Sequence, residues 1–125
     1  MIRFFVLLAA LSLSAPVLAQ PATPEEYAKQ TQAIAIRVQQ QLMGCWTVPE
    51  GEENERLAVD IGFFGAGALD GVPVIARGME KFASKRPVLA ASVMKAIAGC
   101  VPFEGLEALG AGAEERFAVT ITFQS

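Results

Sequence analysis

The nine residues RFAVTITFQ, Arg116–Gln124, alternate between large apolar side chains and small or polar ones. Successive side chains of a β-strand point to opposite faces of the sheet, so this period of two predicts a strand with one buried and one wet face. Such strands are typical of antiparallel sheets. The apolar side is formed by Phe117, Val119, Ile121 and Phe123, and the other side by Ala118, Thr120 and Thr122.

Two further strands are predicted earlier in the chain. Leu57 to Phe64 repeats the alternation, and Val72 to Ala76 follows after a glycine-rich turn. Pro73 has no N–H to donate, which predicts that the second of these strands lies at a sheet edge or starts irregularly. The glycines of the turn have the wrong spacing for a phosphate loop and lead into a strand, so a hairpin without an anion site is predicted.

Two helices complete the expected elements. Thr23, Pro24 and Glu26 fit the N-cap, N1 and N3 positions of a capping box, which predicts a helix from there to about Met43. A second helix is predicted from Pro87 to about Gly99, with an apolar face that ends at Cys100. The segments 77–86 and 104–115 are predicted to be connecting loops. The expected order is therefore α-β-β-α-β.

The N-terminal segment explains much of the mean hydropathy of +0.41. Arg3 precedes an apolar run, and Val17-Leu18-Ala19 supplies small or modest residues before Gln20. This pattern predicts a secretory signal peptide over residues 1–19 and an exported domain over residues 20–125. An uncleaved membrane anchor is the alternative, which the short run and Pro16 disfavour.

The predicted export would place the two cysteines, Cys45 and Cys100, in an oxidising compartment. In an oxidising compartment a single pair of thiols forms a disulfide if the geometry allows it. Two separate buried thiols remain the alternative. The spacing of the pair matches no zinc or redox motif, so no metal site is predicted there.

The chain shows no arrangement of residues for catalysis. It contains no histidine, and Ser84, Ser92 and Ser125 therefore have no histidine partner for a nucleophilic triad. Asp60 and Asp70 are explained by a polar strand face and a turn. We therefore predict a protein that is not an enzyme and that needs no cofactor.

Charge argues against nucleic acid as a partner, because the net charge is −3 and the cluster of Lys81, Lys85 and Arg86 is small. The acidic stretch from Glu50 to Glu55 lacks the alternating Asp, Asn and Gly of a calcium loop. It is predicted to be a solvated loop and no metal site. No stable membrane insertion is expected once the signal peptide is cleaved.

Four short segments, in this order and spacing, resemble a known family. They are Cys45-Trp46-Thr47-Val48-Pro49, Asp70-Gly71-Val72-Pro73, the helix from Ala90-Ala91 and Ala96-Ile97 to Cys100-Val101-Pro102-Phe103, and Val119-Thr120-Ile121-Thr122-Phe123. From Ala28 to Phe123 the chain resembles the C-terminal periplasmic domain of TolA and its TonB-like relatives.

The resemblance implies an α+β fold, with two helices packed on one face of a three-stranded antiparallel sheet. It also implies a disulfide between Cys45 and Cys100, at the ends of the two helices. The function it implies is protein–protein binding in the periplasm, in cell-envelope integrity or outer-membrane transport, with Tol-system proteins or outer-membrane receptors as partners.

In TonB-like members a partner adds a strand beside the sheet, and exposed edges offer unpaired N–H and C=O groups for this. The matching candidate edge strand here is Arg116, Phe117, Ala118, Val119, Thr120, Ile121, Thr122 and Phe123. Without an inner-membrane helix and spacer, a free-standing binding domain is predicted. A membrane-anchored TolA-like component and a small-ligand-binding periplasmic domain are the alternatives.

Overall fold

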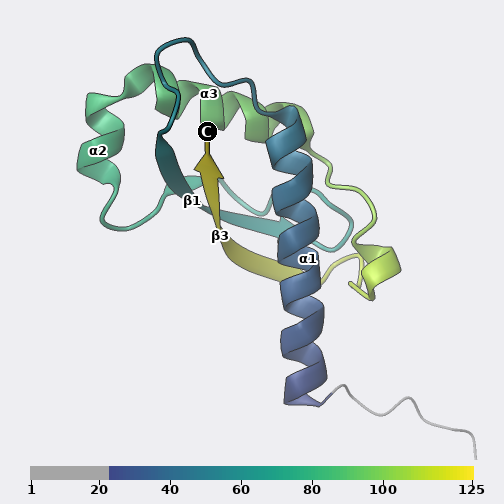
Figure 1. The fold of residues 1–125 in the computed structure, drawn as a ribbon. Helices are drawn as coiled ribbons and strands as arrows, with labels where there is room; N and C mark the ends of the chain where they lie inside the picture. The colour runs from purple at the N-terminus through teal and green to yellow at the C-terminus, as the bar shows by residue number, and fades with distance from the viewer. Residues whose placement is uncertain (1–22) are drawn as a thin grey trace, which may run out of the picture.

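The computed structural model describes residues 23–125, so the predicted signal peptide lies outside the described residues (Figure 1). The order of elements is α1, β1, β2, α2, α3, a short 3-10 helix and β3. No helix in residues 23–125 is long and apolar enough to cross a membrane.

Helix α1 spans Pro24–Cys45 and begins at the predicted capping box. The Glu26 N–H donates to the Thr23 hydroxyl at 3.2 Å, and the Thr23 N–H donates to the Glu26 carboxylate at 3.3 Å. Its buried side chains, Ile34, Val38 and Leu42, recur every four residues and so form one stripe. The first turns of α1 are exposed and extend past the rest of the fold (Figure 1).

The sheet consists of β1 (Arg56–Phe64), β2 (Val74–Ile75) and β3 (Arg116–Gln124), in the order β2-β1-β3. Both pairings are antiparallel. The β1–β3 register runs without a bulge from Arg56 opposite Gln124 to Phe64 opposite Arg116. These elements confirm the predicted α+β class and the order α-β-β-α-β.

Two helical segments follow the sheet's first two strands. Helix α2 covers Glu80–Lys85 and α3 covers Pro87–Cys100, while the 3-10 helix covers Glu107–Leu109. The predicted loops 77–86 and 104–115 thus contain α2 and the 3-10 helix, so the prediction of loops there is wrong in part. The predicted strand Val72–Ala76 is shorter than expected, since only Val74 and Ile75 pair with β1.

One apolar core lies between the inner face of the sheet and helices α1 and α3. Trp46, just after α1, packs its ring edge-on against Phe123, with 5.5 Å between ring centroids. The buried residues of the strands and the two long helices are Ile34, Val38, Leu42, Leu57, Val59, Ile61, Phe63, Leu89, Val93, Ala96, Ile97, Phe117, Ile121 and Phe123.

The glycine-rich turn after β1 packs closely on the segment that follows α3. Gly67 has a φ of +102°, and a Cβ added to it would collide with the backbone of Phe103. Its carbonyl accepts from the Phe103 N–H at 2.9 Å. Glycine is therefore required by conformation and by space, and the turn leads back to β1 through a bridge between Phe63 and Leu69.

Candidate partner-binding edge

β3 lies at the edge of the sheet, and its hydrogen-bonding pattern can be followed from its ends. The Ser125 N–H donates to the Glu55 carbonyl, and the Gly65 N–H donates to the Glu115 carbonyl. Both bonds continue the β1–β3 register by one residue. In an antiparallel ladder, bonded and non-bonded pairs alternate, so the residues of β3 that bond to β1 are Phe117, Val119, Ile121 and Phe123.

The remaining residues of β3 direct their N–H and C=O groups away from β1. They are Arg116, Ala118, Thr120, Thr122 and Gln124. Within residues 23–125, these backbone groups bond to no other strand or loop. β3 thus presents a regular row of donors and acceptors along its outer edge.

The eight residues of the predicted edge strand fall into two sets. Phe117, Ile121 and Phe123 are buried in the core, and Val119 is partly buried. The even-numbered residues lie on the face of the sheet that points away from the core, where Arg116, Ala118 and Thr120 are exposed. A partner at this edge would therefore meet backbone groups together with small and β-branched side chains.

The opposite edge of β1 is occupied. The Ala76 N–H donates to the Ala58 carbonyl, the Asp70 N–H to the Gly62 carbonyl, and the Phe64 N–H to the Ala68 carbonyl. These bonds come from the residue that follows the two-residue strand β2 and from the turn before that strand. The described sheet therefore has two outer edges, a two-residue one on β2 and a nine-residue one on β3.

A hollow of about 400 Å³ lies on the outer face of the sheet beside β3. Asp60 of β1 faces Thr120 of β3 across a non-bonded pair, and the Thr120 hydroxyl donates to Asp60 Oδ1 at 2.6 Å. Val72 and Val74 stand beside them with 85% and 60% of their surfaces exposed. The hollow is lined by Asp60, Ile61, Gly62, Val72, Val74, Ala118, Val119 and Thr120.

Sequence pattern alone does not reveal this group of residues. It predicts Asp60 on a polar strand face, and the structure places it there. The register between β1 and β3 is what brings Asp60 beside Thr120, and a single sequence does not reveal that register. The alternation of both strands was the available signal, because it puts Asp60 and Thr120 on the wet faces of their strands.

Arg116, the first residue of β3, contacts two side chains outside that strand. Its guanidinium lies 3.4 Å from Asp70 Oδ2 and 5.6 Å from the centre of the Phe64 ring. Arg116 therefore ties the first residue of the open edge to the turn that closes the other edge of β1. With a largely exposed side chain, this ion pair contributes little to stability.

Cys45 and Cys100 form a disulfide, as predicted, and their Cα atoms are 5.8 Å apart. The bond joins the last residue of α1 to the last residue of α3. Close by, the Trp46 indole N–H donates to the Ser92 hydroxyl at 3.0 Å, which in turn donates to the Leu89 carbonyl at 2.7 Å. Ser92 thus orients Trp46 over the end of β3.

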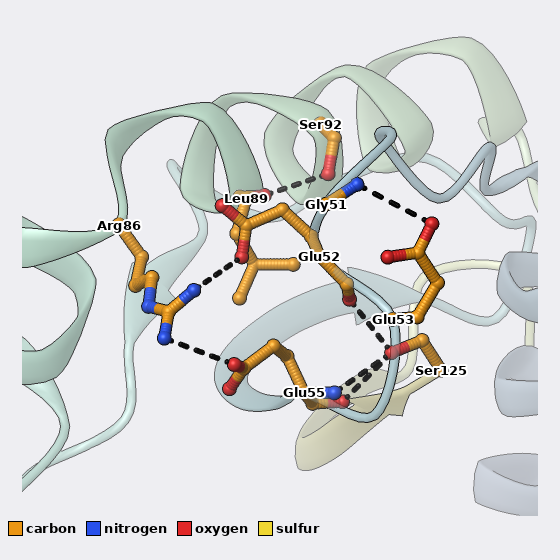
Figure 2. Close-up of polar contacts among 8 residues, drawn as sticks. All are labelled: Gly51, Glu52, Glu53, Glu55, Arg86, Leu89, Ser92 and Ser125. Atoms are coloured by element: carbon orange, nitrogen blue, oxygen red, sulfur yellow. Dashed lines mark hydrogen bonds and ion pairs between the residues drawn. The ribbon is translucent and has the colours of Figure 1, made fainter.

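The acidic loop after α1 is less solvated than predicted. Arg86 contacts Glu52 at 3.1 Å and Glu55 at 3.0 Å, and the Glu52 side chain is only 13% exposed (Figure 2). The Ser125 hydroxyl donates to the Glu52 carbonyl at 2.9 Å and accepts from the Glu55 N–H at 2.9 Å. Arg86 and Ser125 therefore fix this loop to the start of α3 and to the end of β3.

Metal ligands do not gather in residues 23–125, since no three His, Cys, Asp or Glu side chains there could hold one ion. Ser84 uses its hydroxyl within α2, by donating to the Lys81 carbonyl at 2.8 Å.

Comparison with known proteins identifies a family. The chain belongs to the family described as "Uncharacterised conserved protein UCP034077", whose model matches residues 27–125. No curated protein and no solved structure matches this chain.

Proposed function

We propose that this protein is a periplasmic, non-enzymatic binding domain whose partner is another cell-envelope protein. The partner supplies an extended segment that pairs with the outer edge of β3. The observation that carries the proposal is the regular outer edge of β3, a nine-residue strand with no bulge in its pairing to β1. An extended segment that adds to such an edge is bound through main-chain hydrogen bonds to the edge strand.

Two further observations support it. The disulfide between Cys45 and Cys100 is typical of proteins that fold in an oxidising compartment, which agrees with the predicted signal peptide. The resemblance to TolA and TonB C-terminal domains favours partners among Tol-system proteins or outer-membrane receptors.

The experiment separates the outward N–H groups of β3 from its side chains. In Thr120→Pro, the lost N–H is one that points away from β1, so the β1–β3 ladder keeps its bonds. Thr120→Val keeps the N–H and a β-branched side chain. A photo-cross-linking amino acid at Thr122 of the full chain, in the cell that makes it, reports what lies at the edge.

We expect wild type and Thr120→Val to give one cross-linked product with an envelope protein, and Thr120→Pro to reduce it at least tenfold. The same cross-linker at exposed Glu50 serves as the control and should not give that product. Thermal unfolding checks that Thr120→Pro is folded. The proposal is wrong if folded Thr120→Pro cross-links as well as Thr120→Val, if Glu50 gives the same product, or if Thr122 cross-links only to a second copy of this chain.

A further inference from the structure

The hollow on the outer face of the sheet adjoins the edge at which the partner is proposed to bind. We propose that it receives a lysine or arginine side chain of the added strand, whose charged group binds Asp60. This inference rests on the proposed function, because it places the basic residue in the strand paired with β3. A basic residue at this position would distinguish the partner's segment from other extended segments, because its charge pairs with Asp60.

Charge is the first argument. The ion pairs among residues 23–125 join Arg86 to Glu52 and Glu55, and Arg116 to Asp70. Asp60 has no such partner in that part of the chain, and its one described side-chain contact is with the Thr120 hydroxyl. The Asp60 carboxylate, on an exposed residue of the outer face, is therefore paired with no basic side chain of residues 23–125 and is accessible to one from a partner.

Geometry is the second argument. Asp60 and Thr120 are directly opposite in a non-bonded pair, the closer of the two kinds. A residue of the added strand opposite Thr120 would lie two strand spacings from Asp60, about 10 Å in all. Asp60 Oδ1 already leans toward β3 to reach the Thr120 hydroxyl. A long basic side chain laid over Thr120 spans the remaining distance.

The walls of the hollow fit the stem of such a side chain. Gly62 and Ala118 leave its floor low, and the exposed Val72 and Val74 border it on the side away from β3. Lysine and arginine place their methylene groups on apolar surface while the charged end stays at a polar site. An apolar side chain there would cover the carboxylate without pairing it, and an acidic one would be repelled.

The experiment starts from a display library of random linear peptides selected on the full chain. We expect enriched peptides to carry lysine or arginine at one fixed position and to slow amide hydrogen exchange at Thr120 and Thr122. Asp60→Asn keeps an oxygen for the Thr120 hydroxyl but removes the charge, and it should weaken a selected peptide about tenfold. Glu50→Gln, at an exposed acid in the loop before β1 and outside the lining of the hollow, is the matched control and should leave affinity unchanged.

A cycle of changes tests the contact itself. Replacing the basic residue of the peptide by glutamine should weaken binding to wild type about tenfold, with no further loss on Asp60→Asn. Peptides that protect Thr120 and Thr122 but show no basic preference, or that ignore Asp60→Asn, overturn this inference and leave the proposed function standing. Selected peptides that never protect these amides, whether basic or not, overturn both this inference and the proposed function.

Discussion

β2 and β3 both border the central strand β1, but they close its two edges in different ways. β2 pairs through two residues, Val74 and Ile75, and the turn before it supplies further bonds. Pro73 sits beside this pair and has no N–H to offer a neighbour. Short strands and prolines are two of the ways in which proteins make an edge unsuitable for further pairing.

β3 has neither of these protections. It runs for nine residues, contains no proline, and pairs with β1 in an uninterrupted register. Its inner side chains are core residues, so its position is well determined, while its outer backbone groups remain available. The β2 edge of the sheet is thus unsuited to further pairing, whereas the β3 edge is regular. This difference favours β3 as the functional edge.

The largest expected difference between the two strands is in stability. Phe123 is fully buried and packs on Trp46, so Phe123→Ala should lower the free energy of unfolding by about 4 kcal/mol. Val74 is 60% exposed, and Val74→Ala should change it by less than about 0.5 kcal/mol. Chemical denaturation measures both, and similar losses at the two sites would contradict the contrast.

Removing the disulfide should have the next largest effect. The bond closes a loop over a sequence separation of 55, and replacing Cys45 and Cys100 by alanine should cost roughly 3 kcal/mol. Because α1 packs over β3, amide exchange should accelerate more in β3 than in β1 residues that pair with β2. Wild type treated with a dithiol reductant should behave like the variant, and a uniform change across the sheet would refute the link between the disulfide and β3.

The smallest effect is expected at Arg86, which holds the acidic loop near the end of β3. Arg86→Met removes both ion pairs, and since the side chain is 39% exposed, solvent screening limits the loss to about 1 kcal/mol. Arg77→Met, at an exposed arginine outside the described ion pairs, is the control. High salt should shrink the difference between the two variants, and a salt-independent loss would assign Arg86 a packing role instead.

The elements with strong local signals were the ones that the sequence predicted. The capping box at Thr23 and Glu26 located the start of α1, and the alternation in Arg116–Gln124 matched β3 residue for residue. Helix α2 was missed because it has six residues and no side-chain cap at Met79. Its local sequence resembles a polar loop.

Features set by distant contacts were not predictable from local pattern. Glu52 and Glu55 look like parts of a solvated acidic loop until the fold brings Arg86 to them. Asp60 gains its neighbour Thr120 through a register between strands that are far apart in sequence. The resemblance implied which strand is the candidate edge, and the alternation predicted which of its side chains are buried. Which N–H groups point away from β1, such as that of Thr120, is set by the β1–β3 register and needs the structure.

The order of strands also bears on how the chain is made. β1 emerges during synthesis before β3, with the whole of segment 65–115 between them. Until β3 is made, the edge of β1 that later pairs with β3 has no partner strand. An unpaired strand with apolar side chains is prone to aggregate and is a segment that chaperones bind. β3 therefore has two roles: on folding it covers the exposed edge of β1, and in the folded protein its own outer edge is the proposed binding site.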